Sequence, residues 1–269
     1  MKTLFTLPIL FRHPLEFYDR VVTFFEVRLT RFFGNVPPKY KVIDVDEAVK
    51  NVGKVLGDEA SHFLNELPLS EIENWVDNKI KKICSNAPFP LVHNADTILA
   101  KFSYLFCRLL KPTIVLETGV AYGMMSAFIL QALEVNKEGI LYSIDLPPLG
   151  RDADRFVGIL IPDELKARWR LNRGVSKRIL PRLLPVLGSV DLFIHDSLHT
   201  YRNMKREFHL VTPYLSPKAA VISDDIDSNT AFKEWMMEVS PEYWTIIKEE
   251  AKESLFGVAI KLNAYPFDS

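Results

Sequence analysis

The segment that decides the fold runs from Thr113 to Gly123 and reads TIVLETGVAYG. It begins as a short apolar run that ends in an acid, and Gly119 and Gly123 then precede a helical pattern. A strand, a glycine-rich turn and a helix in this order are typical of α/β folds, because glycine lets the backbone turn tightly and pass close to a ligand. The helix after Gly123 would also present unpaired N–H groups toward the turn.

The same rhythm continues downstream, where short apolar runs alternate with amphipathic helical patterns. The runs are apolar throughout, which predicts strands covered on both faces, as in a parallel sheet. We expect strands at 113–117, 140–145, 169–172, 190–195 and 219–223, and helices at 96–110, 123–133, from 176, at 201–214 and at 229–239. Residues 243–248 and 255–261 have no helix between them. The prediction is a Rossmann-like, doubly wound, mostly parallel α/β sheet with a C-terminal antiparallel hairpin.

The first part of the chain shows helical patterns without the alternation of strands and helices found downstream. Residues 1–90 predict an N-terminal helical extension, a substrate lid or an oligomerisation element, before an α/β domain at 91–269. An apolar stripe recurs at helical spacing from Leu15 to Phe33, with arginines between its members. We expect the stripe to pack on the α/β domain or on a second subunit, which would make a homo-oligomer. Peripheral contact with a membrane through residues 14–33 is the alternative. Residues 34–41 read as a linker, followed by helices at 46–56 and 70–84.

Composition narrows the class of protein. The 269 residues are 48% hydrophobic and 25% charged, with a net charge of −1, which suits a globular protein and predicts no nucleic-acid partner. No stretch approaches the roughly 20 apolar residues of a membrane span. The apolar stretch from Leu4 to Phe11 contains Pro8 and lacks a signal-peptide cleavage site. Cys84 and Cys107 have neither disulfide-framework nor zinc spacing. We expect a cytoplasmic protein.

A nucleotide site is predicted at the carboxyl ends of the first three strands. Asp145 ends the second strand, where its carboxylate can accept hydrogen bonds from both hydroxyls of a ribose. Gly174 and Ser176 follow the third strand and would lie near an adenine. Met124 stands where a dinucleotide fingerprint needs a small residue, which argues against NAD. The alternative for Asp145 is a turn former before two prolines.

A second group of polar residues follows the fourth and fifth strands. Asp196, Asp224 and Asp225 would converge there and repel one another unless they are protonated or share a cation. Oxygen ligands of this kind suit Mg²⁺, whereas helix capping and loop hydrogen bonds are the alternative role. His199 could act as a general base or be a loop histidine bonded to backbone. His195 is expected to pack inward.

These motifs, in this order, resemble the class I methyltransferases of the methyltransferase 24 family and the related macrocin, cephalosporin-pathway and catechol-type O-methyltransferases. The motifs are N-A-D at 94–96, E-T-G-V-A-Y-G at 117–123, L-Y-S-I-D-L-P-P at 141–148, H-D-S-L-H-T-Y-R-N-M-K-R-E-F at 195–208, P-Y-L-S-P at 213–217 and S-D-D-I at 223–226. The resemblance covers about residues 91–262. It departs from the usual pattern at Met124 and at Lys218-Ala219, where Gly-Gly is common.

The resemblance implies S-adenosylmethionine (SAM)-dependent transfer of a methyl group, to a hydroxyl of a small molecule, with assistance from Mg²⁺. The implied SAM-binding residues are Glu117, Gly119, Ala121, Gly123, Asp145, Gly174, Ser176 and Asp196. The implied Mg²⁺ ligands are Asp196, Asp224 and Asp225. His199 would be the catalytic base, with Asp196 beside it, because the catechol-type relatives carry a basic residue three positions after the first metal ligand.

Two other classes of function remain open at this stage. The carboxylates Asp196, Asp224 and Asp225 could belong to a metal-dependent hydrolase, although that leaves the glycine turn and Asp145 without a role. A non-catalytic scaffold with the same fold is the second alternative, although it would not need the whole set of polar strand ends. The sequence does not identify the methyl acceptor.

Overall fold

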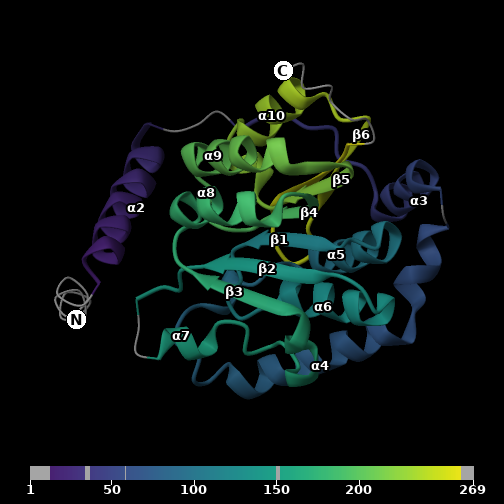
Figure 1. Ribbon diagram of the computed structural model, residues 1–269, viewed down its shortest axis with the longest axis horizontal. Helices are drawn as coiled ribbons and strands as arrows, with labels where there is room; N and C mark the ends of the chain where they lie inside the picture. The colour runs from purple at the N-terminus through teal and green to yellow at the C-terminus, as the bar shows by residue number, and fades with distance from the viewer. Residues whose placement is uncertain (1–12, 34–36, 58, 150–151, 262–269) are drawn as a thin grey trace.

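The computed structural model has a central sheet with helices on both faces (Figure 1). It describes residues 13–33, 37–57, 59–149 and 152–261. The apolar stretch from Leu4 to Phe11 and part of the expected linker at 34–41 lie outside these residues.

Seven strands of the described chain form one sheet in the order β3-β2-β1-β4-β5-β7-β6. Their bounds are β1 Ile114–Thr118, β2 Ile140–Asp145, β3 Trp169–Arg173, β4 Val190–His195, β5 Leu215–Ser223, β6 Tyr243–Lys248 and β7 Leu255–Ile260. The first five strands pair in parallel, and β7 is antiparallel to both β5 and β6. The predicted mixed sheet with a terminal hairpin is confirmed. Its chain order reverses between β1 and β4, the switch point where such sheets bind ligands.

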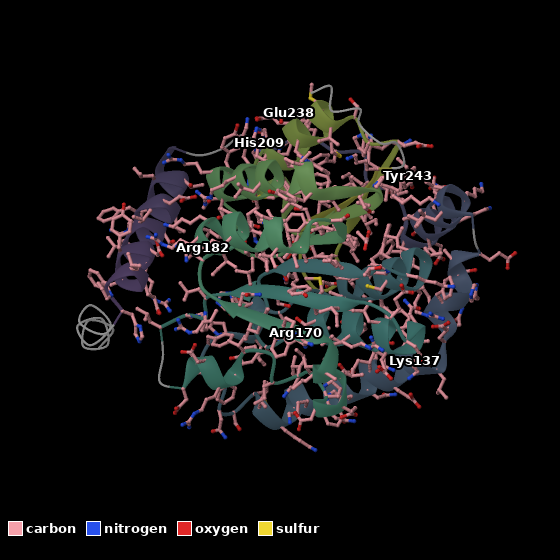
Figure 2. All side chains as sticks on the ribbon, in the orientation of Figure 1. Lys137, Arg170, Arg182, His209, Glu238 and Tyr243 are labelled. Carbon is pink, nitrogen blue, oxygen red and sulfur yellow. The ribbon has the colours of Figure 1, made fainter. Side chains whose placement is uncertain are left out.

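The helices form two layers. One face of the sheet carries α3 Val45–Leu56, α4 Leu67–Ile83, α5 Thr97–Leu110 and α6 Met124–Asn136, and the other carries α8 Ser176–Leu187, α9 Tyr201–Val211 and α10 Ala231–Val239. A short helix, α7 Ala153–Phe156, follows β2 and was not predicted. Side chains fill the space between the layers, while charged groups such as Lys137, Arg170 and Arg182 lie on the outside (Figure 2).

Helix α5 lies in the interior of the layer formed by α3, α4, α5 and α6. Its residues from Leu99 to Cys107 are buried apart from Lys101, so it is apolar almost all round. It packs on the sheet beside α6 and under α3, while α4 packs on α6, and all four helices join the same hydrophobic core. Asp96 caps it, with Oδ1 accepting from the backbone N–H of Ile98 at 2.8 Å.

Several boundaries differ from the prediction, and two of these differences have a clear local cause. β5 begins at Leu215, not Ala219, because Leu215 already pairs with Val190 before an irregularity shifts the register. α9 ends at Val211 and continues to Tyr214 as a short 3-10 turn. Pro213 lies in that turn and has no N–H with which to continue an α-helix.

The N-terminal helix α2 Pro14–Phe33 forms as predicted, but the predicted packing of its apolar stripe on the α/β domain is wrong. Leu15, Phe25 and Leu29 are 65%, 58% and 51% exposed. α2 stands at the edge toward which the β2 and β3 arrows point (Figure 1). Its polar face turns inward there, because that edge presents basic and hydroxyl groups with which carboxylates can pair.

The contacts of that polar face are ionic. Asp19, which is 3% exposed, contacts Lys177 Nζ at 2.9 Å and Arg178 Nε at 2.6 Å. Glu16 contacts Arg173 at 2.7 Å, and Glu26 accepts a hydrogen bond from Thr200. In the described ranges no helix has both the length and the apolar character needed to cross a bilayer.

We predict that Asp19→Asn loosens α2 without unfolding the sheet. The variant keeps the side-chain volume but removes the charge that Lys177 and Arg178 share. Hydrogen–deuterium exchange of amides 14–30 should accelerate about 10-fold or more, since a hydrogen bond to a charged group contributes roughly 1.5–3 kcal/mol. Asp163→Asn, in an exposed pair with Lys166, is the control and should change nothing in α2. Equal exchange in Asp19→Asn and wild type would contradict the ionic anchor.

Candidate active site

The turn after β1 packs against the end of β4. Gly119 has φ +89°, and a Cβ on it would lie 1.9 Å from the carbonyl oxygen of Asp196. Gly123 has φ +90°, and a Cβ there would meet the Cα of Gly158 at 2.7 Å. Both positions therefore require glycine because neighbouring backbone comes so close. At both glycines the backbone therefore packs closely against other backbone of the same chain. The approach of this turn to a ligand stays a prediction.

A pocket of about 1270 Å³ opens at the carboxyl edge of the sheet beneath α2. The predicted cofactor residues that line it are Gly119, Ala121, Asp145, Gly174, Ser176 and Asp196, and they are joined by His199, Asp224 and Asp225. Glu117 and Gly123 are not among its lining residues. The structure thus brings most of the predicted site residues around one cavity.

Asp145 presents a free carboxylate oxygen at this pocket. Its Oδ1 accepts a hydrogen bond from the backbone N–H of Val120 at 3.1 Å. Its Oδ2 is buried and has no hydrogen-bond partner among the described residues. Burial raises the pKa of Asp145 to about 6. A buried acceptor without a partner costs free energy, so a ligand that brings hydroxyl donors would relieve that cost.

Glu117 lies behind the pocket wall and is fully buried. Its Oε2 accepts hydrogen bonds from Ser126 at 2.7 Å and Ser143 at 2.6 Å. Burial raises the pKa of Glu117 to about 7, although the two serine hydroxyls oppose that rise. In the structure without ligand, Glu117 contacts the two serines and is separated from the cavity.

Asp196 and Asp224 meet where β4 and β5 end. The N–H of Asp196 bonds to the carbonyl of Thr118 at 2.8 Å, and the N–H of Asp224 bonds to that of His195 at 2.9 Å. These bonds continue the parallel ladder by one residue and aim both carboxylates at the same side. Burial, followed by the charge of Asp224, raises the pKa of Asp196 well above its ordinary range. Two buried carboxylates in contact need a proton or a cation between them.

His199 and Asp225 form a pair beside these carboxylates. His199 Nδ1 lies 2.6 Å from Asp225 Oδ2, and Nε2 lies 3.7 Å from Asp196 Oδ1. Burial lowers the pKa of His199, but the hydrogen bond and charge of Asp225 outweigh it and raise the pKa above its ordinary value of 6.5. With Nδ1–H donated to Asp225, the lone pair of the neutral imidazole is on Nε2, a buried atom with no hydrogen-bond partner among the described residues.

The predicted trio of metal-binding carboxylates does not assemble as a trio. Among the described residues, the group whose donor atoms lie within 4.8 Å of one another is Asp196, His199 and Asp224. Asp225 turns instead to the imidazole. It adopts a left-handed backbone with φ +50°, which Asp tolerates better than most residues, and this turn directs its side chain toward His199.

A buried network under the site was not predicted. His195 packs inward as expected, with Nδ1 2.7 Å from Glu207 Oε2. Glu207 also accepts hydrogen bonds from Thr118 at 2.6 Å and Ser197 at 2.9 Å. Burial opposes ionisation of Glu207, but His195 and the hydroxyls lower its pKa to about 2. The network fixes the loop between β4 and α9, and the acid at helical position 207 gave no sequence signal for it.

Sequence reasoning also missed residues that reach the pocket from distant segments. Lys252, in the turn between β6 and β7, lines the cavity, as do Arg20 and Phe24 of α2. Each belongs to a segment that the fold brings to the site from one end of the chain. The sequence showed the charge or aromatic character of these residues but did not indicate that they reach the site.

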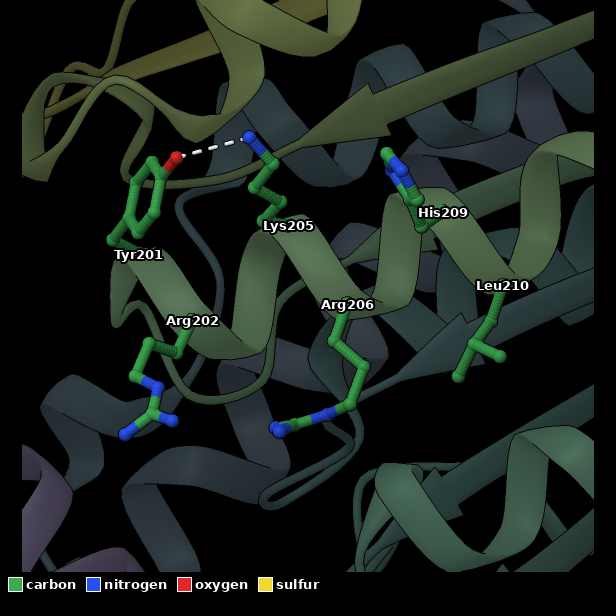
Figure 3. Close-up of a pocket in the computed structure, with 6 residues that line it drawn as sticks. All are labelled: Tyr201, Arg202, Lys205, Arg206, His209 and Leu210. Carbon is green, nitrogen blue, oxygen red and sulfur yellow. Dashed lines mark hydrogen bonds between the residues drawn. The ribbon is translucent and has the colours of Figure 1, made fainter.

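A smaller depression of about 400 Å³ lies on the outer surface of α9. It is lined by Tyr201, Arg202, Lys205, Arg206, His209 and Leu210, all from one helix (Figure 3). Lys205 Nζ contacts the Tyr201 hydroxyl at 3.0 Å and Glu234 at 2.9 Å, so its charge is already paired. Arg206 also lines the larger pocket, and none of the predicted site residues lines this depression.

Comparison with known proteins agrees with this geometry. Residues 116–226 match the family described as "Methyltransferase domain". Among solved structures, the O-methyltransferase from Bacillus cereus in complex with SAH is similar at 15% identity and TM-score 0.55, over 80% of this chain and 99% of that one. The O-methyltransferase TomG from Streptomyces achromogenes, in complex with SAM, is similar at 15% identity and TM-score 0.51, over 71% of this chain and 98% of that one. These likenesses show the fold. No curated protein matches in sequence.

The matched segment contains the glycine turn, Asp145 and both polar strand ends, and it lies in a sheet of the class I methyltransferase order. Residues 116–226 therefore belong to a methyltransferase domain. The chain as a whole has the Rossmann-like fold of class I SAM-dependent methyltransferases.

We predict that Glu117→Gln changes how stability depends on pH. The pKa of Glu117 is raised on folding, so the folded wild type keeps a proton that the unfolded chain releases above pH 4.5. Its free energy of unfolding should fall as pH rises toward 7, and glutamine should abolish that fall. Urea unfolding at pH 5 and pH 8 should show a relative gain for Glu117→Gln of about 2–3 kcal/mol at the higher pH. Parallel stability curves for both proteins would contradict the buried, protonated acid.

Proposed function

We propose that the protein transfers a methyl group from SAM to a hydroxyl oxygen of a small molecule. The observation that supports it best is the His199–Asp225 pair, which stands at the edge of the same pocket as Asp145. One side of that cavity carries an acceptor for ribose hydroxyls and the other carries a base. A hydrolase with the same carboxylates would leave Asp145 without a role.

The residues present fit SAM. Asp145 Oδ2 is the free acceptor that a ribose would occupy, and Gly119 with Ala121 forms the turn beside it. Gly174 and Ser176 line the same cavity after β3, where we propose the adenine. Asp196 lies between this half of the pocket and the base. Glu117 would act from behind the wall, by holding Ser126 and Ser143 beneath the turn.

His199 would take the proton of the acceptor. Asp225 holds Nδ1, so the lone pair is on Nε2, and an imidazolium formed by taking the proton there would be stabilised by the same carboxylate. When bound, SAM supplies a methyl group on a sulfonium, and the carbon–sulfur bond breaks as the carbon–oxygen bond forms. The remaining contribution of the chain is alignment of the two reactants.

The acceptor would have an apolar body. The part of the pocket beneath α2 is lined by Phe24, Val27, Phe89, Val92 and Leu149. Such a wall favours an aromatic or aliphatic molecule whose hydroxyl reaches His199. We propose that α2 is the lid of this cavity, and that residues 1–90 serve as the substrate-covering extension of the methyltransferase domain at 91–269.

Magnesium assistance stays a prediction. Asp196, His199 and Asp224 are the described residues that could hold a divalent cation. Two features of the site disagree with the predicted ion. The third predicted ligand, Asp225, is engaged by His199, and Lys252 Nζ lies 3.8 Å from Asp224 Oδ2. We therefore derive no step through Mg²⁺.

We predict that the wild type binds SAM and that Asp145→Asn weakens this binding about 10–100-fold. The amide keeps the size of the side chain but loses the charge-assisted bonds to the ribose. Isothermal titration calorimetry with SAM measures the effect. Asp191→Asn is the control, because Asp191 accepts from the N–H groups of Thr113 and Ile114 at the opposite end of β1. A wild type that binds NAD but not SAM would refute the proposed function.

We predict that the rate of methyl transfer rises with pH as His199 loses its proton. The pKa of His199 is raised, so the midpoint should lie above 6.5. Asp225→Asn removes the cause of the rise and should move the midpoint to lower pH, since burial is then less opposed. His199→Ala should slow transfer about 10²–10⁴-fold and abolish the titration. The imidazole resonances followed by NMR give the same pKa without an acceptor, and an unchanged pKa in Asp225→Asn would exclude the pair.

A further inference from the structure

The turn between β6 and β7 reaches the catalytic edge from the C-terminal end of the described chain. Asp96 holds it, with Oδ2 accepting from the N–H of Ala251 at 2.8 Å while Oδ1 caps α5. Within the turn, the N–H of Glu249 donates to the carbonyl of Ser254 at 3.0 Å. The turn is therefore a fixed element of the site, with its side chains in set positions.

Lys252 is the residue that this turn presents. Its Nζ lies 3.8 Å from Asp224 Oδ2, its side chain is 25% exposed, and it lines the pocket. Burial lowers the pKa of Lys252, but the charges of Asp224 and Glu249, followed by those of Asp196 and Asp225, raise it above its ordinary value. The group is an ammonium at neutral pH, half enclosed by carboxyl groups.

The surroundings of Lys252 explain what its charge does. Asp224 is 1% exposed, and its Oδ2 has no hydrogen-bond partner among the described residues. Asp225 shares its charge with His199, and Glu249 is buried beside Asp224 with a raised pKa. The ammonium thus lies nearest Asp224, while His199 Nε2 lies 3.7 Å from Asp196 Oδ1 and its Nδ1 is held by Asp225.

A divalent cation would have to share this position. It would need oxygens of Asp196 and Asp224, and Lys252 Nζ already lies 3.8 Å from Asp224 Oδ2. Two positive charges within a few ångströms repel strongly in a buried site. Magnesium also prefers several oxygen ligands, whereas the third donor here is an imidazole.

We propose that Lys252 is the built-in cation of this site. Its ammonium occupies the place predicted for Mg²⁺ beside Asp196 and Asp224, and it stabilises the acceptor oxygen as that oxygen loses its proton. This inference rests on the proposed methyl transfer. The proton goes to His199 Nε2, the new carbon–oxygen bond forms as the carbon–sulfur bond breaks, and Lys252 keeps its own proton throughout.

Asp96 acts through Lys252 as a positioning residue. Its two carboxylate oxygens join the N-terminus of α5 to the turn that carries the ammonium. Asp96→Asn keeps one acceptor oxygen and should leave the helix cap while weakening the hold on Ala251. The turn would then place Lys252 less firmly.

Metal binding tests the role of Lys252 without any knowledge of the acceptor. The probe is Mn²⁺ alone, followed by electron paramagnetic resonance and calorimetry on the full chain. Wild type should bind Mn²⁺ weakly, and Lys252→Met should bind it at least ~10-fold more tightly, because a positive charge facing the carboxylates is gone. Lys252→Arg keeps the charge and should behave like wild type. Lys248→Met, in an exposed pair with Glu253 on the same hairpin, is the control.

Two results would overturn the proposal. One is tight Mn²⁺ binding by wild type, which needs no variant to be folded. The other is equal Mn²⁺ affinity in wild type, Lys252→Met and Lys252→Arg. SAM titration of the same samples separates this outcome from failure of the proposed function, because loss of SAM binding by wild type would remove the methyl transfer whatever the metal result.

Discussion

Burial of negative charge at one edge of the sheet is the constraint on which the rest of this structure depends. Carboxyl groups follow β1, β2, β4 and β5, and the helical layers remove them from water, which is costly unless each one finds a partner. The chain supplies a different partner to each. Serine hydroxyls serve Glu117, a backbone amide serves Asp145, an imidazole serves Asp225, and an ammonium faces Asp224. The candidate ligand sites are the places where a carboxylate oxygen is left without a partner, since a buried unpaired acceptor favours binding of a donor.

The anchoring of α2 follows from the same electrostatics. An apolar stripe normally decides which side of a helix is buried, yet here carboxylates on the opposite side pair with Arg173, Lys177 and Arg178 around the pocket mouth. Ion pairs that are largely removed from solvent hold position better than exposed ones. Helix α2 is therefore anchored by charge, while Leu15, Phe25 and Leu29 are left toward solvent and Phe24 lines the pocket.

Local patterns along the chain predicted most of the fold and the wall of the pocket. Strands such as 140–145 and 190–195 are continuous apolar runs, and residues such as Asp145 and Asp196 stand directly at their ends, so sequence position alone places them at the edge. Features that depend on contacts between distant segments were not predictable in this way. The pairing of Asp225 with His199 depends on a left-handed backbone at 225. The places of Lys252 and of the inward face of α2 depend on how the fold brings the β6–β7 turn and α2 to the pocket.

The position of β7 has a consequence for biosynthesis. It is last in sequence among the described strands, yet it lies between β5 and β6, so the sheet stays incomplete until residues 255–260 have been made. The turn before it carries Lys252 and bonds to Asp96, which also starts α5 near the beginning of the domain. A chain synthesised only as far as α10 would thus lack β7 and the ammonium of Lys252, and its catalytic edge would be incomplete.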